Sequence, residues 1–449
     1  MSPTQIKNIP EKDVVRIWQR QLQKQRHLAD CEGKPIEVIY PGRPNDSRGG
    51  DFRDAVVNSG SQYQYGCIEV HTRTSGWQAH GHHLDPIYNQ VVLHVALEKD
   101  RPGGTCRQNG LPIPTVILDK NMLRHRGKGK SKDILPCLPC QGVNRKRKLS
   151  DLENWLDKAG DSRLYTKATR YEVELSGMEA DQSLYLGILE ALGYSQNQAP
   201  FRELGCRLPL HLMEKIAGRK YAGEGHLVRL QALLLGKAGL LPSQRLLYES
   251  GGEYVNTLES LWAGLSQAAA LCRDNWELFK VRPGNYPVRR IVALSYLIFR
   301  FRQKGCFQSL LDLVRKASLT RAQSEFESAL LVKAEGYWAG QVDFGHSHLF
   351  RGQALLGRER AAEIIINVLL PFFLCWSRIR AETALERKIR DIYHSYPRTQ
   401  TNSIERHMLH QLSLAPTRVK TARRQQGLIH FYKTFCTQGK CADCSLGHN

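Results

Sequence analysis

Residues 49–95 read GGDFRDAVVNSGSQYQYGCIEVHTRTSGWQAHGHHLDPIYNQVVLHV, and this stretch decides the fold of the N-terminal part of the chain. Asp51 opens one strand-like run and Glu69 lies in the next, with polar turn residues at 58–61 between them. If the turn joins an antiparallel hairpin, Asp51 faces Glu69, and directly opposed Cβ atoms are roughly 5 Å apart. Two carboxylates at that distance repel unless a cation lies between them, so the pair predicts a metal-dependent site.

Side chains alternate along a strand, so Glu69, His71 and Arg73 share one face. Ile68 and Val70 point to the other face, where we expect a hydrophobic core. On the shared face, a neutral His71 imidazole can orient or deprotonate water. Arg73 is a candidate phosphate contact, and together with His80 and His82 it makes up the predicted substrate-binding set.

A cluster of possible metal ligands follows the second strand: His80, His82, His83, Asp85 and His94. Such a mixture is acceptable to Zn²⁺, Mn²⁺ or Fe²⁺, which favours an alternative hypothesis, a His/carboxylate metal hydrolase of a small substrate. Its ligands are Glu69 and three histidines: His71, His80 and His82. His94 lies inside an apolar strand, which is more typical of a hydrogen-bonded core histidine.

The C-terminal tail carries Cys436, Cys441 and Cys444 directly after a helix-like segment. These gaps predict a Zn²⁺ knuckle or an iron–sulfur cluster, and the alternative is three reduced thiols. The tail lacks an obvious fourth ligand. If it folds back on the chain, three residues are candidates for that position: Cys137, Cys140 and His448.

The 449-residue chain has 64 Lys and Arg against 43 Asp and Glu, a net charge of +21. This excess predicts a polyanionic partner, with nucleic acid favoured over an anionic membrane; an inert basic surface is the alternative. The first residues lack the apolar run of a secretory signal, and the twelve irregularly spaced cysteines fit a reducing cytoplasm. The apolar run at 364–376 is too short to cross a bilayer, so we expect a buried helix end and no membrane partner. Nothing in the sequence specifies an oligomeric state.

The pattern of elements predicts an α/β (α+β) N-terminal core with a mixed sheet, followed by a mainly α-helical C-terminal domain. The order expected in the core is a helix at 13–25, three strands, a short helix and a buried strand at 91–97. Basic residues then crowd a connector, and helical periodicity follows it. The predicted segments are the core at 1–122, the connector at 123–150, the helical domain at 151–426 and the Cys-rich tail at 427–449.

The core resembles the PD-(D/E)XK (restriction-endonuclease-like) nuclease superfamily in its element order and in its Asp51-to-Glu69 separation. This resemblance implies that the two acids hold Mg²⁺ or Mn²⁺, which polarises a scissile phosphate and helps to ionise the attacking water. The sequence departs from that pattern at two points. Gly50 stands where a Pro is expected, and His71 stands where a Lys is expected, so no fixed positive charge is supplied there.

The chain as a whole is identified as a member of an uncharacterised bacterial domain-of-unknown-function family, number 2851. The resemblance is carried by PIEVIYPG, GGDF, CIEVHTRTSGWQAHGHHLDPIYNQVVLHV, RPGNYPVRRI, GRERAAEIIINVLLP and the QQGLIHFYKTFC tail. It implies a Pro at the position of Gly50 in most relatives, and it brings no activity with it.

Three functions therefore follow from the sequence as hypotheses. The first is a Mg²⁺- or Mn²⁺-dependent nuclease with Asp51, Glu69 and His71 at its centre. The second is a non-catalytic nucleic-acid-binding protein that keeps the same core, which the His71 departure favours. The third is the small-substrate metal hydrolase built on the histidine cluster.

Overall fold

The structure, a computed structural model, forms two compact units, each assembled from segments that are distant in sequence. The first comprises 1–160, 401–420 and 424–449, and the second comprises 161–400 and 421–423. The described residues are 9–60, 62–119, 121, 138, 140–141, 148–218, 225–245, 252–265, 270–279, 281–347 and 354–447. Most of the predicted basic connector, together with Cys137 and His448, lies outside them.

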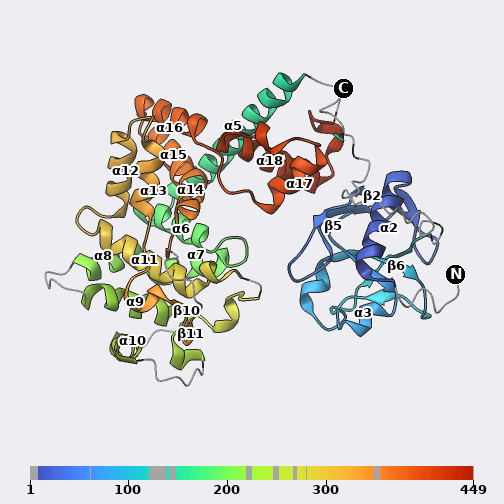
Figure 1. Cartoon of the computed structure of the whole chain (residues 1–449), viewed down its shortest axis with the longest axis horizontal. Helices are drawn as coiled ribbons and strands as arrows, with labels where there is room; N and C mark the ends of the chain where they lie inside the picture. Colours follow the sequence, from blue (N-terminus) through green and yellow to red (C-terminus); the bar gives the residue numbers. More distant parts are fainter. Residues whose placement is uncertain are drawn as a thin grey trace. The chain divides into compact units, whose positions relative to one another are not determined.

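The first unit is built on a seven-stranded mixed sheet with the order β1-β2-β4-β5-β6-β9, in which β3 also pairs with β4 (Figure 1). The strands from β1 to β5 pair antiparallel, whereas β5–β6 and β6–β9 pair parallel. Its elements are α2 (Glu11–Lys24), β1 (His27–Ala29), β2 (Pro35–Tyr40), β3 (Arg43–Pro44), β4 (Phe52–Asn58), β5 (Tyr63–Arg73), α3 (Gly76–Ala79), η1 (Pro86–Gln90), β6 (Val91–Glu98), β7 (Thr105–Cys106), β8 (Pro112–Ile113) and β9 (Thr115–Ile117).

The predicted register of the β4–β5 hairpin is confirmed near the two acids. Phe52 pairs with Ile68, which aligns Asp51 with Glu69. Further along, the register shifts by one residue at a bulge that contains Asp54, whose φ is 62°. A left-handed residue is acceptable here because Asp tolerates this region better than most side chains, and bulges use it to bend a strand.

The core of this unit forms between the sheet and helix α2. Val14, Trp18 and Leu22 lie on one side of α2 as predicted, and they pack with Ile68 and Val70 of β5. Seven of the eight residues of β6 are buried, as expected of a parallel strand covered on both faces. The predicted helix, three longer strands, short helix and buried strand therefore occur in that order, with two short strands, β1 and β3, that the sequence did not predict.

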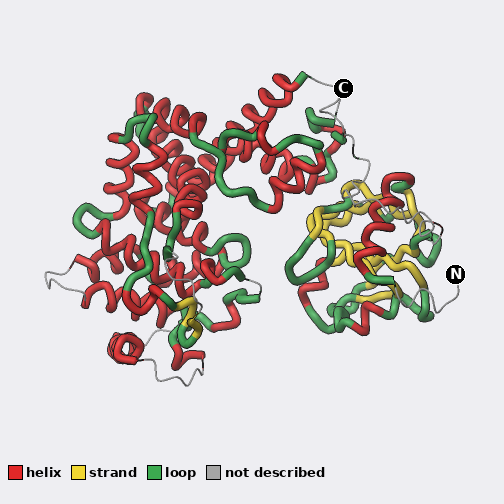
Figure 2. The backbone as a smooth tube through the Cα atoms, in the orientation of Figure 1, coloured by secondary structure: helices red, strands yellow, loops and turns green. Residues whose placement is uncertain are grey.

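The second unit is helical apart from a small two-stranded sheet, as Figure 2 shows. The helices that follow the sheet in sequence are α5 (Leu149–Leu175), α6 (Ala180–Leu192), α7 (Gln198–Arg207), α8 (Leu210–Gly218), α9 (Gly225–Lys237), α10 (Gly252–Leu265), α11 (Pro287–Phe301), α12 (Cys306–Lys316), α13 (Ala322–Leu330), α14 (Arg358–Ile364), α15 (Leu370–Ile379) and α16 (Thr383–Ser395). The fold class predicted from the sequence, a mixed α/β region followed by a largely helical one, is confirmed.

The apolar run of the second unit lies in a helical stretch longer than its sequence indicates. Helices α14 and α15 join through a π-helical turn, Ile365–Leu369, into one stretch of 22 residues, Arg358–Ile379. Pro371 has no backbone N–H, so one hydrogen bond of the regular α-helix is missing near this turn. The wider hydrogen bonding of a π-helical turn is accommodated at such a position. By length and composition the stretch could span a membrane, so the prediction that it is too short is wrong; 72% of its most apolar window is nevertheless buried in the unit, as in a core helix.

The C-terminal segment returns to the sheet of the first unit. Helices α17 (Ser403–Gln411) and α18 (Ala422–Thr434) share a hydrophobic cluster with Tyr40 of β2 and Val56 of β4. The Tyr40 hydroxyl lies 2.6 Å from His407 Nε2, and the Tyr432 hydroxyl donates to Asp54 Oδ2 at 2.6 Å. The predicted division into a helical domain at 151–426 and a Cys-rich tail at 427–449 follows chain order. The two units differ from it, because buried contacts join the chain's C-terminal residues to its N-terminal strands.

The core gives a stability prediction. Leu93 of β6 is fully buried, so Leu93→Ala removes packing and leaves a cavity, and we expect a loss of about 2–5 kcal/mol in the free energy of unfolding of this unit. The matched control is Leu84→Ala, since Leu84 is 71% exposed and its truncation should change that energy by less than about 0.5 kcal/mol. Urea denaturation measures both; equal effects would contradict the proposed core.

Candidate metal centre

Two carboxylates lie side by side where strands β4 and β5 pair. The backbone N–H of Asp51 donates to Glu69 Oε2 at 3.2 Å, and the backbone N–H of Val70 donates to Asp51 Oδ2 at 2.9 Å. These two bonds cross between the strands and fix both side chains on one face. Glu69 is only 6% exposed. The structure thus brings together the two acids that the sequence paired.

Burial raises the pKa of both carboxyl groups. The pKa of Asp51 rises to about 7, through burial first and the neighbouring charge of Glu69 second. Burial raises the pKa of Glu69 to about 8. Within the described residues, neither carboxylate pairs with Lys or Arg. Near neutral pH the pair therefore retains a proton unless a cation replaces it.

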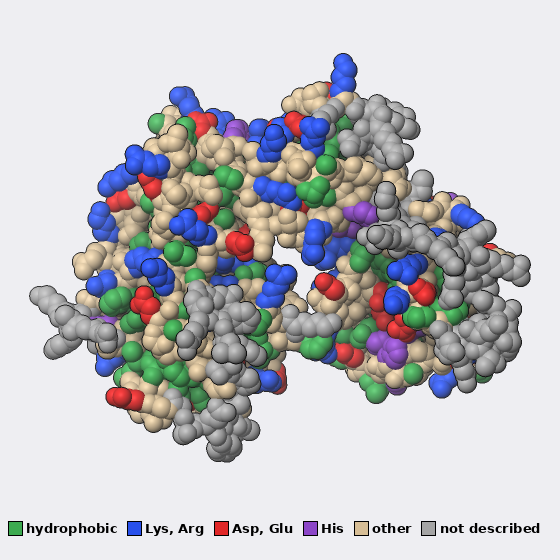
Figure 3. Space-filling view, in the orientation of Figure 1, with side chains coloured by type: hydrophobic (Ala, Val, Ile, Leu, Met, Phe, Trp, Pro, Cys, Tyr) green, Lys and Arg blue, Asp and Glu red, His purple; other side chains and the backbone are tan. Residues whose placement is uncertain are grey.

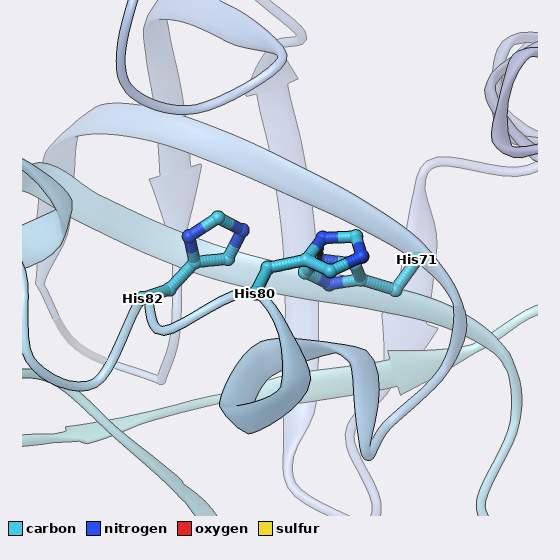
Figure 4. Close-up of side chains that lie close together, drawn as sticks. All are labelled: His71, His80 and His82. Atoms are coloured by element: carbon cyan, nitrogen blue, oxygen red, sulfur yellow. Dashed lines mark hydrogen bonds between the residues drawn. The ribbon is translucent and has the colours of Figure 1, made fainter.

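Three imidazoles face the same place, and Figure 4 shows their rings converging from a strand and a loop. His71, His80 and His82 each offer a ring nitrogen, and these nitrogens all lie within 4.8 Å of one another. His71 comes from β5, whereas the other two follow α3. A Cβ at Gly76 would lie 2.8 Å from His71 Cδ2, so glycine there lets α3 begin against the His71 ring.

Glu69 joins the carboxylate pair to the histidines. Its Oε1 lies 3.0 Å from His82 Nε2 and 3.6 Å from His71 Nε2. His82 Nε2 is buried, and among the described residues its contact with Glu69 is not matched by any hydrogen bond. The His82 ring is held by stacking on Tyr88, with ring centroids 3.8 Å apart. A buried, fixed and unsatisfied ring nitrogen beside a carboxylate is the arrangement that a metal ion completes.

His71 remains a neutral imidazole. Burial, followed by the neighbouring charge of His94, lowers its pKa to about 2. A neutral ring can bind a metal ion through Nε2, but it cannot supply the positive charge of a Lys.

A hydrogen-bonded chain supports His71 from behind. His71 Nδ1 lies 3.0 Å from His94 Nε2, and His94 Nδ1 lies 3.0 Å from Thr105 Oγ1. If His71 donates from Nδ1 and His94 donates to Thr105, His71 Nε2 carries a lone pair that can accept from His80 Nδ1 or bind a metal ion in its place. His94 is thus a satisfied core histidine, as its sequence context indicated, and it also orients a candidate ligand.

The cluster opens to solvent on the side of His80. The His80 side chain is 48% exposed, and its Nδ1 lies 3.2 Å from His71 Nε2 and 4.0 Å from Glu11 Oε1. Glu11 precedes the apolar positions of α2 and belongs to no ligand-like motif, so the sequence gives no sign that it reaches the cluster. Only the packing of α2 on the sheet brings it here.

Other predicted site residues lie elsewhere. Arg73 forms an ion pair with Glu98, 3.1 Å away, rather than with the cluster. Glu37 of β2, a further acid of the same sheet, is partly exposed and lies 3.8 Å from His27 Nε2. Asp85 accepts a hydrogen bond from the Ile87 backbone at the start of η1, and its carboxylate pairs with Arg48 at 3.0 Å.

The tail cysteines form a separate group. Cys436 and Cys444 are buried, Cys441 is intermediate, and the buried Cys140 lies in the same hydrophobic cluster as Cys436 and Cys444. The sequence proposed Cys140 as one of three candidate fourth ligands. The other two, Cys137 and His448, lie outside the described residues.

The donor set of the first cluster fits a divalent ion of the Mn²⁺, Fe²⁺ or Zn²⁺ type. Glu69, His71 and His82 supply one carboxylate and two imidazoles that already approach one another, with Asp51 beside them. Imidazole ligands favour these ions over Mg²⁺, which prefers oxygen.

Comparison with protein families identifies the chain. A family model described as "Protein of unknown function (DUF2851)" matches residues 11–402. The chain belongs to this family. The matched region of this DUF2851 protein includes Glu11, Asp51, Glu69 and the histidine cluster, whereas the tail cysteines lie beyond it. The comparisons with curated proteins and with solved structures give no match.

Metal affinity should rise with pH. The raised pKa values of Asp51 (about 7) and Glu69 (about 8) mean that a metal ion must displace protons at lower pH. We expect Mn²⁺ or Zn²⁺ affinity to increase more than about tenfold between pH 6 and 8 and then to level off. Isothermal titration in matched buffers measures this. Glu69→Gln removes one of the displaced protons, so its affinity should be lower and its pH dependence shallower; identical pH profiles would contradict the assignment.

The support of His71 by His94 gives a second prediction. His94→Leu leaves the ligands in place but frees the His71 ring to rotate, so metal affinity should fall roughly 10- to 100-fold. Thr105→Val, a near-isosteric change one bond further away, should have a smaller effect in the same direction. Thr115→Val is the matched control, since Thr115 Oγ1 contacts Thr105 but not the histidines. An unchanged affinity in His94→Leu would rule out this supporting role.

Proposed function

We propose that this protein is a divalent-metal-dependent phosphodiesterase that cleaves nucleic acid. The observation that carries the proposal is the buried Glu69 carboxylate, which lies beside Asp51 and within 3.0 Å of the unsatisfied Nε2 of His82. A bound ion would neutralise the acids, polarise a phosphate oxygen and lower the pKa of water.

The neutral state of His71 explains how the site would differ from PD-(D/E)XK nucleases. In that superfamily a Lys stands at this position and carries a fixed charge. Here His71 is buried with a strongly lowered pKa and points Nε2 toward Glu69, 3.6 Å away. The lost charge is thus replaced by a further metal ligand, which shifts the preferred ion from Mg²⁺ toward Mn²⁺, Fe²⁺ or Zn²⁺.

The order of elements around the acids supports the nuclease-like interpretation. Helix α2 is followed by the antiparallel strands β2, β4 and β5, then by short helical turns and β6, which is parallel to β5. Asp51 directly precedes β4 and Glu69 lies within β5, the second and third of these strands. This is the placement that the resemblance implies.

The charge of the protein supports a polyanionic substrate. A cavity of about 640 Å³ is lined by Arg48, Gly49, Arg53 and Tyr65 among others. Its lining includes Asp54 but none of the acids and histidines of the candidate centre, although Gly49 is only two residues from Asp51 in sequence. Tyr65 is 55% exposed, so its ring can stack on a base, while arginines contact phosphates. Figure 3 shows Lys and Arg spread over the visible faces of both units rather than gathered in one stripe, so the charge supports a polyanionic partner without marking a binding face.

His80 is the candidate proton acceptor. Its ring is about half exposed at the opening of the cluster, and imidazole is the side chain that most often serves as a general base. Its Nδ1 contacts His71 Nε2, so a proton taken from water can be held beside the ligands without entering the buried pair.

The test is cleavage of labelled single-stranded DNA, duplex DNA and RNA with Mg²⁺, Mn²⁺ or Zn²⁺. We expect metal-dependent cutting that falls at least about 100-fold in Glu69→Gln and in Asp51→Asn, because both remove charge that faces the ion. Glu37→Gln is the matched control, since Glu37 is an acid of the same sheet outside the cluster. Circular dichroism checks that all variants fold.

The outcomes separate the proposal from its alternatives. Equal cutting by wild type and Glu69→Gln would overturn the site. Binding of nucleic acid without cutting would favour the non-catalytic platform. Cleavage of bis-p-nitrophenyl phosphate but of no polymer would favour a small-substrate hydrolase, the alternative that the three converging histidines support.

A further inference from the structure

Four cysteines from two distant parts of the chain meet against the sheet of the first unit. Cys140 follows the sheet in sequence, whereas Cys436, Cys441 and Cys444 belong to the C-terminal segment. Three of the four, Cys140, Cys436 and Cys444, are buried in one hydrophobic cluster. The fourth, Cys441, lies close enough for its charge to act on both Cys140 and Cys436.

A single amide group links the two parts of the cysteine group. Gln411 Nε2 donates to Cys140 Sγ at 3.3 Å and to Cys436 Sγ at 3.5 Å, and the Gln411 side chain is buried. The two sulfur atoms are therefore no more than about 6.8 Å apart, although their residues are almost 300 positions apart in sequence. Amide donors to sulfur are typical of sites where thiolates carry charge, because they stabilise that charge in a buried place.

The backbone between the tail cysteines is shaped to present them. Cys436 and Cys441 each begin a 3-10 turn, Cys436–Gln438 and Cys441–Asp443, and Cys444 directly follows the second turn. Gly439 joins the turns with φ 66°. A Cβ there would lie 3.0 Å from a methyl carbon of Ile39, so glycine permits both the turn and its close approach to the sheet.

We propose that Cys140, Cys436, Cys441 and Cys444 are the four ligands of an iron–sulfur cluster that fastens the C-terminal segment to the N-terminal sheet. Four thiolates suit either zinc or an iron–sulfur cluster. Around a single zinc ion, with Zn–S near 2.3 Å, tetrahedral geometry places the sulfur atoms roughly 4 Å apart. Among the described residues, no three of these sulfur atoms lie within 4.8 Å of one another. The wider spacing fits a polynuclear cluster better than one ion.

Burial raises the pKa of all four thiols, and Arg26 partly opposes this at Cys441. A bound metal would stabilise the thiolates that burial disfavours. The cluster site is distinct from the histidine centre, and it neither requires nor excludes the proposed phosphodiesterase activity. Its effect would be to hold α18 and the following turns against β2 and β4, where Tyr432 already contacts Asp54.

The experiment is anaerobic purification of the full chain, followed by measurement of iron, acid-labile sulfide and zinc and by the visible absorption and electron paramagnetic resonance of the reduced protein. We expect iron and sulfide in wild type, and their loss in Cys140→Ser and in Cys441→Ser. Cys375→Ser, a buried cysteine of the second unit, is the matched control and should retain both. Glu69→Gln should retain both as well.

Because Cys140→Ser could fail to fold, the wild-type protein supplies a second measurement. Oxidative removal of the cluster should release the C-terminal segment, so that limited proteolysis cuts at 436–447 faster than in the intact protein. Stoichiometric zinc without sulfide would overturn the iron–sulfur assignment. Absence of any metal from the anaerobic wild type, or retention of iron in a folded Cys140→Ser, would overturn the four-cysteine site.

Discussion

The burial of Glu69 next to Asp51 is the constraint on which the candidate centre depends. Two acids removed from water have raised pKa values, and in the described chain no Lys or Arg compensates them. Two buried carboxylates repel each other when both are ionised, and a shared proton or a bound cation relieves this repulsion. Imidazoles rather than a Lys or Arg surround the pair, and together with the two acids they form the candidate ligand set.

The mixed sheet makes this arrangement possible. Antiparallel pairing of β4 with β5 aligns the two acids, and parallel pairing of β5 with β6 places Glu69 directly beside His94. The crossover between β5 and β6 carries His80 and His82 back over the face that holds His71. One sheet thus supplies the acids, a ligand and its hydrogen-bonded support, while the short crossover supplies the remaining imidazoles.

The C-terminal segment has a comparable relation to the same sheet. Its helices bury Tyr40 and Val56, and its cysteines meet Cys140 through Gln411. The segment therefore adds to the first unit a hydrophobic cluster that the N-terminal strands do not complete alone. If the iron–sulfur proposal holds, a redox-sensitive centre helps to keep Tyr432 in contact with Asp54, which lies in the bulge of β4 three residues after Asp51.

The sequence by itself determined the element order, the face shared by Glu69 and His71, and the register that aligns Asp51 with Glu69, because these follow from strand alternation and a short turn. It also named His80 and His82, as substrate contacts or as the ligands of the alternative hydrolase, and Cys140 as one of three candidate fourth ligands of the tail. Only the tertiary structure decided that Glu11 reaches the cluster, that Arg73 turns to Glu98, and that His94 supports His71. The physical reason is the separation of the contacting residues along the chain. The periodicity of a segment reports which of its own residues share a face. The packing of α2, the crossover and the returning tail depends instead on burial between segments that share no local pattern.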